Sequence, residues 1–193
     1  MIRDLINHSI SVKKDLLKNT KALKLIDSLI HDSIHCLKNQ GKIILCGNGG
    51  SFADAQHISA EFTSRFLFDR DSLASISLGC NNSTISAIGN DYGFEQAFSR
   101  ELSSIGDEGD IFIPISTSGN SPNIIKAIEA AKEKRLITYG LTGNNNGIMT
   151  QLCNCIEVPS TSTPRIQECH ILIGHIICEA IETALFKKEA IYS

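Results

Sequence analysis

The sequence lacks the charge and the apolar runs that would assign it to several large classes. Lysine and arginine number 18 against 21 aspartates and glutamates, so the formal net charge is −3. That balance excludes the basic surface of a nucleic-acid-binding protein. No apolar run approaches the roughly 20 residues of a membrane span, and the start does not resemble a signal peptide. We therefore expect a cytoplasmic protein with no nucleic-acid or membrane partner.

The seven cysteines include no C-x-x-C pair and are odd in number. Most lie inside apolar runs, and Cys153 and Cys155 are too close in sequence for an easy disulfide. We interpret them as small buried residues in a reducing compartment, rather than as a disulfide framework or zinc knuckle.

No linker, internal repeat or low-complexity tract divides the chain, so we expect residues 1–193 to form one domain. Residues 2 to about 38 show two helical patterns that break at Asn19-Thr20, and we expect the first helix to pack against another subunit. Apolar strands are expected at 42–46, 74–78, 110–115, 136–141 and 155–158. Helices are expected between them at about 51–66, 83–88, 95–104, 121–134 and 148–152. A final helix is expected from Thr163-Pro164 to about 185. This alternation predicts an α/β fold: a three-layer αβα sandwich around a mostly parallel five-stranded sheet, with extra N-terminal helices.

The first expected strand leads into a glycine-rich turn, Gly47-Asn-Gly-Gly-Ser51. Asn48, Gly49 and Gly50 allow the backbone to approach a ligand closely, and Ser51 stands where a helix N-cap belongs. Such a turn accepts phosphate or other anions, although turns of this composition serve many ligands and sometimes none.

His57 and Glu61 follow on the expected helix, four residues apart and therefore on one face. A histidine and a carboxylate at this spacing can share a divalent metal or divide the roles of base and orienting group. The alternative is an ordinary exposed polar pair.

A second polar turn, Ser116-Thr-Ser-Gly-Asn-Ser121, follows the third expected strand. Ser121 suits an N-cap and Pro122 a first helical residue. Its hydroxyls and amides would form a cup for a phosphate without lysine, and the missing Gly-Lys-Ser/Thr argues against nucleotide hydrolysis. A capped serine-rich loop without a ligand is the alternative.

A further turn, Gly89-Asn-Asp-Tyr-Gly93, offers Asn90 and Asp91 to sugar hydroxyls, although a plain turn explains it equally well. On the last helix, Gln167 and His175 are eight residues apart, about two turns, and so lie on roughly one side.

Five motifs in order resemble the phosphoheptose isomerases of the sugar-isomerase (SIS) domain superfamily. They are CGNGGS, ADAQHISAEFTSRF, AIGNDYGF, ISTSGNSPNIIKAI and RIQECHILIGH. The resemblance covers essentially the whole chain. It implies isomerisation of sedoheptulose 7-phosphate to D-glycero-D-manno-heptose 7-phosphate, the first step of ADP- or GDP-heptose precursor synthesis for lipopolysaccharide or capsule. It also implies a homotetramer with sites at subunit contacts and one zinc per subunit.

The same resemblance assigns residues to roles. It implies Glu61 and His175 as catalytic base and acid, and His57, Glu61, Gln167 and His175 as metal ligands. The implied substrate shell consists of Asn48, Gly49, Gly50, Ser51, Glu61, Arg65, Asn90, Asp91, Ser116, Thr117, Ser118, Ser121 and Gln167. Pro164 departs from the family pattern, in which a small or acidic residue is expected.

The residues suit this chemistry independently. Moving a carbonyl between adjacent carbons needs a base for a carbon-bound proton, and a carboxylate serves. A histidine, with an ordinary pKa near about 6.5, can move protons between the two oxygens. A carboxylate that ligates a metal is a weaker base, so Glu61 would have to hold the metal loosely or leave it. The alternative function is a non-catalytic SIS adaptor that binds a replication initiator; such relatives lack an acid and a histidine at positions 61 and 175.

Overall fold

The chain begins with two helices joined at one residue. In the computed structural model, which describes residues 1–187, α1 covers Ile2–Lys18 and α2 covers Thr20–Lys38. The side-chain oxygen of Asn19 accepts a hydrogen bond from the Ala22 N–H and so caps α2. The predicted helical segment and its break are confirmed.

Five strands form one parallel sheet. They are β1 (Ile43–Gly47), β2 (Ser75–Ser77), β3 (Ile111–Ser116), β4 (Ile137–Gly143) and β5 (Asn154–Val158), in the order β2-β1-β3-β4-β5. β1 pairs with β2 on one side and with β3 on the other, so the winding of the chain reverses between β1 and β3. In sheets of this type, ligands bind beyond the carboxyl ends of the strands at such a reversal.

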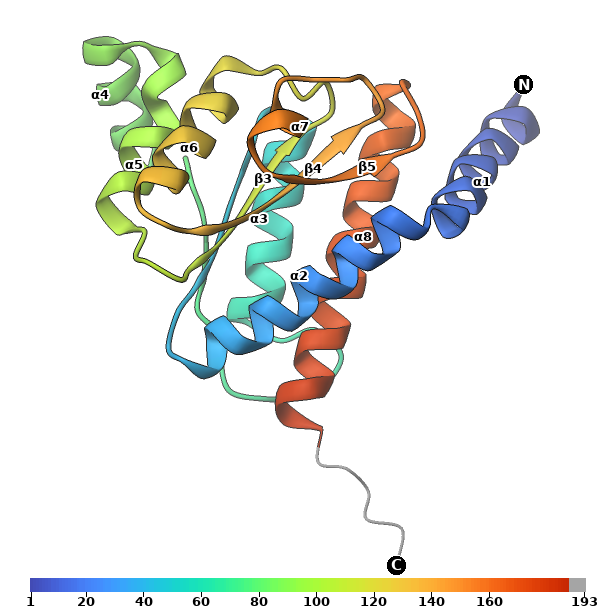
Figure 1. The fold of residues 1–193 in the computed structure, drawn as a ribbon, viewed down its shortest axis with the longest axis horizontal. Coiled ribbons are helices and arrows are strands. Elements are labelled where there is room, and N and C mark those ends of the chain that lie inside the picture. Colours follow the sequence, from blue (N-terminus) through green and yellow to red (C-terminus); the bar gives the residue numbers. More distant parts are fainter. Residues whose placement is uncertain (188–193) are drawn as a thin grey trace, which may run out of the picture.

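Helices cover both faces of the sheet (Figure 1). The remaining elements are α3 (Gly50–Thr63), α4 (Asn82–Tyr92), the 3-10 turn η1 (Phe94–Gln96), α5 (Ala97–Ile105), α6 (Pro122–Glu133), α7 (Met149–Leu152) and α8 (Thr163–Phe186). Ile43 and Leu45 of β1 pack with α2, α3 and α8, whereas Ile44 and Cys46 pack with α5 and α6. Because β1 is buried on both faces, its sequence is continuously apolar rather than alternating.

The structure confirms the predicted sandwich, and every strand lies within about two residues of its predicted position. The turn predicted at Gly89–Gly93 is wrong, because α4 continues through Tyr92. Gly93 has a φ of +89°, which non-glycine residues rarely adopt, and this conformation ends the helix. Asn90 and Asp91 therefore stand on the last turn of α4.

Among residues 1–187, α8 is long and apolar enough to cross a membrane by length and composition. Its apolar face is already used inside the protein, where Ile166, Ile173 and Ile181 are fully buried in the core cluster shared with α2 and α3. We therefore interpret α8 as the central helix of the core.

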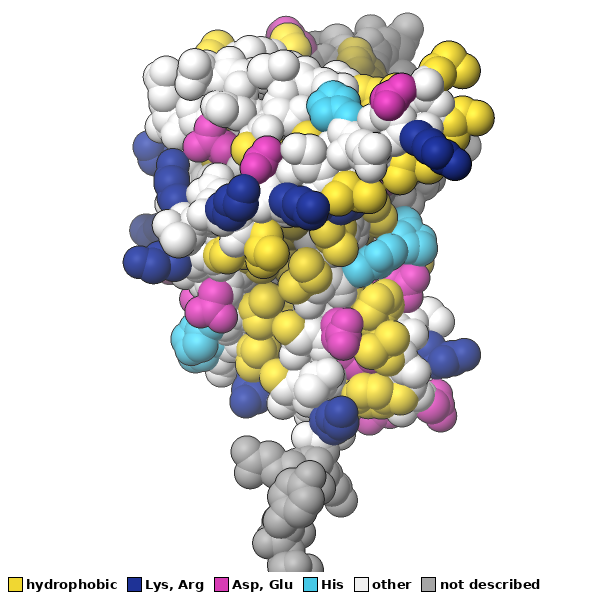
Figure 2. Space-filling model, turned by 90° about the vertical axis from the view of Figure 1, so that its right-hand side faces the viewer, with side chains coloured by type: hydrophobic (Ala, Val, Ile, Leu, Met, Phe, Trp, Pro, Cys, Tyr) yellow, Lys and Arg dark blue, Asp and Glu magenta, His cyan; other side chains and the backbone are white. Residues whose placement is uncertain are grey.

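Helix α1 exposes apolar side chains to solvent. Ile2, Leu5, Ile6, Ile10 and Leu17 are each at least 44% exposed, whereas only Val12 and Leu16 of this helix are buried. Figure 1 shows α1 at one edge of the molecule, and Figure 2 shows hydrophobic side chains gathered on that side. Exposed apolar side chains gathered in this way are typical of protein interaction surfaces.

Candidate active site

The first candidate turn lies between β1 and α3. Gly49 has a φ of +56°, in the left-handed region that favours glycine, and acts as the N-cap of α3. A side chain at Gly47 would lie 2.5 Å from the Ser51 carbonyl carbon, so the turn can close this tightly only around glycine. The expectation that Ser51 caps the helix is wrong. The left-handed glycine starts the helix earlier, and Ser51 is buried in its first turn.

The second turn lies between β3 and α6. The predicted N-cap at Ser121 and the first helical residue Pro122 are confirmed. The Ser116 and Ser121 hydroxyls lie 3.1 Å apart, and the Gly119 N–H donates to Ser116 Oγ over 3.2 Å. Ser118 stays exposed at the rim. These groups close a neutral, polar turn at a helix N-terminus, where an anion is stabilised.

A reciprocal amide pair joins the two turns. Asn48 Nδ2 donates to Asn123 Oδ1, and Asn123 Nδ2 donates back to Asn48 Oδ1, each over 2.9 Å. The carbonyl of Thr117 accepts a hydrogen bond from the Gly143 N–H over 3.1 Å, which ties the second turn to β4. Asn123 did not stand out in the sequence, yet it holds the two expected ligand-binding turns together.

Helices α3 and α8 lie side by side and run in the same direction. At their N-terminal ends, a side chain at Gly50 would lie 2.6 Å from Gln167 Nε2. Further along, a side chain at Gly174 would lie 2.6 Å from Ile58 Cγ1. Glycine at both places lets the helices approach closely, and this brings two residues 118 positions apart into contact.

That contact is between His57 and His175. Their Nε2 atoms lie 3.0 Å apart, and His57 Nε2 lies 3.4 Å from Glu61 Oε1. Both distances are measured from His57 Nε2. Glu61 Oε1 and His175 Nε2 are therefore separated by at most about 6.4 Å, the sum of the two distances. His57 is 49% exposed and Glu61 22% exposed, so the cluster is open to solvent and to a substrate.

Other predicted site residues do not join this cluster within one chain. Gln167 lies beside the first turn, and Arg65 is exposed after the end of α3. Asn90 donates to Asp91 over 2.8 Å, and both are exposed on α4, which Figure 1 shows at the far side of the molecule from α1. No hydrogen bond among residues 1–187 connects these four to His57, and their substrate roles stay predictions.

Asp54 is a titratable neighbour that the sequence analysis missed. It lies three residues before His57 on α3, and its Oδ2 is buried without a hydrogen-bond partner among residues 1–187. Burial raises the pKa of Asp54 to about 6, although His57 draws it down. The only signal in the sequence was an acid three positions before a histidine, a spacing common on helices. Asp54 can hold a proton near the cluster in mildly acidic solution.

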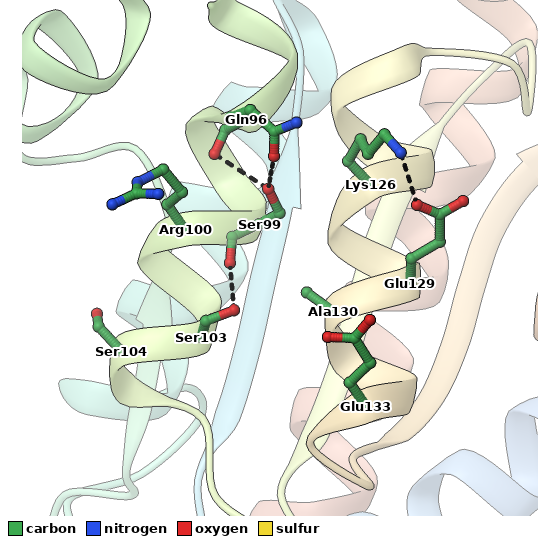
Figure 3. Close-up of a pocket in the computed structure, with 9 residues that line it drawn as sticks. All are labelled: Gln96, Ser99, Arg100, Ser103, Ser104, Lys126, Glu129, Ala130 and Glu133. Atoms are coloured by element: carbon green, nitrogen blue, oxygen red, sulfur yellow. Dashed lines mark hydrogen bonds and ion pairs between the residues drawn. The ribbon is translucent and has the colours of Figure 1, made fainter. Parts of the chain in front are cut away.

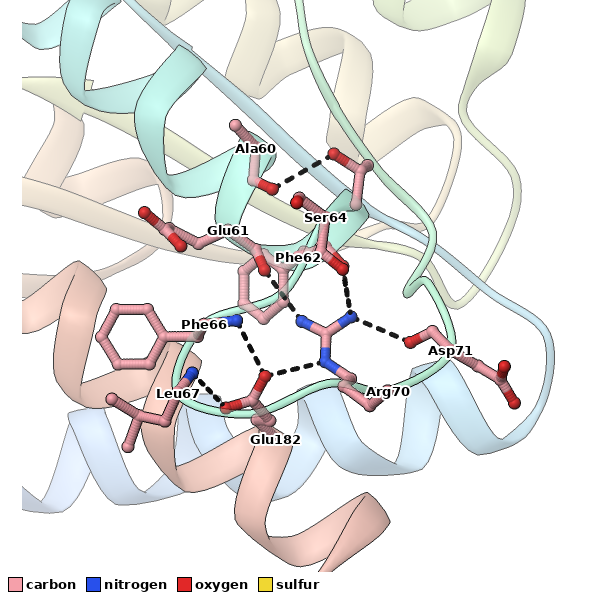
Figure 4. Close-up of polar contacts among 10 residues, drawn as sticks. Ala60, Glu61, Phe62, Ser64, Phe66, Leu67, Arg70, Asp71 and Glu182 are labelled. Atoms are coloured by element: carbon pink, nitrogen blue, oxygen red, sulfur yellow. Dashed lines mark hydrogen bonds and ion pairs between the residues drawn. The ribbon is translucent and has the colours of Figure 1, made fainter.

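A buried ion pair between Arg70 and Glu182 lies at the C-terminal end of α3 (Figure 4). Burial opposes ionisation of Glu182, but the N–H groups of Leu67 and Phe66 and the Arg70 guanidinium outweigh it and hold its pKa below the ordinary value. Glu182 is therefore charged at neutral pH. By contrast, His170 is fully buried on α8 and burial lowers its pKa to about 4, as suits a neutral core histidine.

His57, His175 and Glu61 carry the kinds of donor atom that a divalent metal such as zinc binds. Two ligands of one tetrahedral zinc, at about 2.0–2.1 Å from it, lie roughly 3.4 Å from each other. The contacts of His57 with His175 and Glu61 are of that size. Among residues 1–187, no three histidine, cysteine, aspartate or glutamate side chains are arranged as a complete metal site. The predicted ligand Gln167 lies beside the first turn instead, so a complete site would need a rearrangement of these side chains.

A groove of about 540 Å³ lies elsewhere, between α5 and α6 (Figure 3). Two of the charged side chains that line it form an ion pair with each other, since Lys126 contacts Glu129 over 3.0 Å. The groove contains none of the predicted site residues, and α5 and α6 pack on the opposite face of the sheet from α3 and α8. We therefore take the two turns and the histidine cluster as the candidate active site.

The fold and the site define a protein of the SIS domain class, and the SIS domain family model matches residues 10–143. A phosphoheptose isomerase of Aneurinibacillus thermoaerophilus is 54% identical over 189 residues, covering 97% of this chain and 96% of the relative. Phosphoheptose isomerase 2 of Campylobacter jejuni is 55% identical, covering 93% and 90%. The chain belongs to the phosphoheptose isomerase family, which confirms the resemblance seen in its motifs.

Solved structures agree with this assignment. Phosphoheptose isomerases from Neisseria gonorrhoeae and Francisella tularensis match with TM-scores of 0.88 and 0.90, at 38% and 34% identity. Each match covers 94% of this chain, with 97% and 96% of the respective structure. These comparisons give no support to the alternative of a replication-initiator adaptor.

Proposed function

We propose that this chain is an aldose–ketose isomerase that converts sedoheptulose 7-phosphate into D-glycero-D-manno-heptose 7-phosphate. One observation carries the proposal most directly. A carboxylate from α3 and an imidazole from α8, Glu61 and His175, meet at His57 on the helix that follows the first of two turns suited to a sugar phosphate. The isomerase relatives support the same reaction.

The reaction moves protons within the substrate. The Glu61 carboxylate takes the proton from C1, next to the carbonyl at C2, while the C2 oxygen gains a proton and an enediol forms. The proton then returns to C2, and the C1 hydroxyl gives up its proton to become the aldehyde. His175 carries protons between the two oxygens, since imidazole both donates and accepts near neutral pH. No atom is gained or lost overall.

The serine turn would bind the phosphate at the distant end of the substrate. Removing the exposed Ser118 hydroxyl should raise KM by about 10- to 100-fold, because one hydrogen bond to a charged group contributes about 1.5–3 kcal/mol and each 1.4 kcal/mol is a factor of about ten. We expect kcat of Ser118→Ala to change little, since the reacting carbons lie at the other end. Steady-state kinetics check this, and a large fall in kcat at unchanged KM would refute the phosphate role.

We propose zinc, one per subunit, held by His57, Glu61, Gln167 and His175. Bound there, zinc would polarise the substrate carbonyl as a Lewis acid. Removal of metal with a chelator should lower turnover strongly, and added zinc should restore it. Elemental analysis of the purified protein, paired with the assay, checks this prediction. Full activity in protein shown to be metal-free would contradict it.

We also propose a cytoplasmic homotetramer whose active sites lie at subunit contacts. The exposed apolar side chains of α1 support this, because a second chain could cover them. The separation of Asn90 and Asp91 from His57 also supports it, because these residues could complete the site of a second chain. The product would feed ADP- or GDP-heptose synthesis for lipopolysaccharide or capsule. Light scattering measures the assembly.

The experiment that tests the function is direct. Purified protein with added zinc is incubated with sedoheptulose 7-phosphate, and formation of the aldose is followed by NMR. We expect the equilibrium mixture of ketose and aldose to form. Absence of product from folded, zinc-loaded protein would overturn the proposal.

A further inference from the structure

The ion pair between Arg70 and Glu182 is almost completely buried. The Arg70 Nε and Glu182 Oε1 atoms lie 2.9 Å apart, and the two side chains are 2% and 1% exposed. Burying two charges costs much of what their attraction returns, and apolar residues of similar volume often stabilise a protein equally well. Stability alone is therefore a weak explanation for charges at this place. The groups to which they bond suggest another.

Glu182 holds the segment that follows α3. Its two carboxylate oxygens accept hydrogen bonds from the Phe66 N–H over 2.8 Å and the Leu67 N–H over 2.7 Å (Figure 4). The Phe66 ring in turn lies against the His175 ring, with centroids 5.6 Å apart. Glu182 and His175 are seven residues apart on α8. The Glu182 carboxylate therefore holds the main chain of the residue whose ring lies beside an imidazole of the same helix.

Arg70 holds the end of α3 itself. Nη2 donates to the Glu61 carbonyl and Nη1 to the Phe62 carbonyl, each over 2.8 Å (Figure 4). Nη1 also donates to the carbonyls of Ser64 and Asp71. The last carbonyls of a helix have no partner within it, and here one planar guanidinium binds several of them at once. The backbone position of Glu61 is thereby tied to α8 through the ion pair.

We propose that Arg70 and Glu182 are positioning residues for the isomerisation, which together set the geometry of Glu61 and His175 without touching the substrate. The inference rests on the proposed function. Arg70 fixes the main chain of Glu61, and Glu182 fixes the main chain of Phe66, whose ring lies against His175. The two catalytic groups come from helices far apart in sequence, and this pair connects those helices at the end where the carboxylate lies.

The test replaces both charges by apolar residues of similar volume, in the double variant Arg70→Met with Glu182→Leu. We expect it to fold with a melting temperature near that of the wild type, because no buried charge is left unpaired. Its kcat should fall at least about tenfold with little change in KM, because substrate binding remains while the reacting groups lose their alignment. A stable double variant with wild-type kcat would overturn the proposal.

Two further variants keep the test decisive. Arg70→Lys retains the charge of the pair but cannot bind several carbonyls in one plane, so its kcat should fall even if the double variant fails to fold. A normal kcat for Arg70→Lys would likewise count against positioning. Arg135→Met with Glu108→Leu is the matched control. That pair, 3.1 Å apart, is 74% and 67% exposed, and its removal should leave kcat unchanged.

A readout independent of turnover separates this inference from the proposed function. The ¹⁵N NMR signals of the His57 and His175 rings report their mutual contact in protein without substrate. We expect these signals to shift in the double variant and in Arg70→Lys, but not in the control. If the wild type failed to isomerise the sugar, the proposed function would fall, while unchanged ring signals would refute the positioning role on their own.

Discussion

Replacement of Glu61 by glutamine should lower kcat by about 10²–10⁴-fold, the usual contribution of a positioned general base. The amide keeps the shape of the carboxylate but cannot take a proton from carbon. The fold should persist, because the bond that anchors this residue runs from Arg70 to the Glu61 main-chain carbonyl and does not involve its side chain. Steady-state kinetics and a thermal melt measure the two effects, and His175→Gln should behave in the same way.

The matched control for Glu61→Gln is Glu179→Gln. Glu179 is an exposed carboxylate on α8 that takes part in no ion pair among residues 1–187, so its replacement should leave kcat unaltered. A kcat for Glu61→Gln that is close to the wild-type value would remove Glu61 from its role as base.

The close approach of α3 and α8 depends on Gly174. In Gly174→Val, the new Cβ would lie 2.6 Å from Cγ1 of Ile58 and closer still to its terminal carbon, and Ile58 is itself only 2% exposed. Overpacking of this kind costs about 1–3 kcal/mol, far above the few tenths gained from replacing glycine in a helix. We expect a net loss of about 1–3 kcal/mol in the free energy of unfolding. Activity should fall as well, because His57 and His175 are the chain neighbours of the two clashing residues.

Two variants test the cause of that loss. Ile58→Ala removes the atoms that the new side chain would meet, so the double variant should be more stable than the sum of the single effects implies. Gly89→Val is the control, because a Cβ at this position in α4 meets nothing within 4 Å. If Gly174→Val unfolds like the wild type, α3 and α8 have room that the structure does not show.

Much of the fold could be predicted from local patterns. Apolar runs predicted all five strands, most clearly β1 and β3, which are buried along their whole length and almost entirely apolar. The serine turn predicted the start of α6 correctly. The errors lay at glycines. Gly49 lets α3 begin before Ser51, the residue expected to cap it. Gly93 ends α4, so the helix includes residues 89–92, where a turn was expected. Backbone angles at glycine are permissive, so sequence alone does not say where such residues bend the chain.

The site was harder to predict because its groups meet across long stretches of chain. His57 and Glu61 share a helix and were found by spacing, but their contact with His175 depends on the packing of α3 against α8. Glu182 gave no signal, since a charged residue on a helix ordinarily faces water, and its partner Arg70 lies 112 residues earlier. In the sequence, only the family resemblance connects the two helices.

The reciprocal hydrogen bonds between Asn48 and Asn123 bear on how the enzyme should respond to changes in pH and ionic strength. Carboxamides do not titrate, and dissolved salt screens charges while leaving a bond between neutral groups almost unchanged. The spacing of the two turns should therefore be constant from mildly acidic to alkaline buffers and at high ionic strength. Any dependence of substrate affinity on those conditions would then reflect the phosphate and the ionisable residues, and not a change in the shape of the cup.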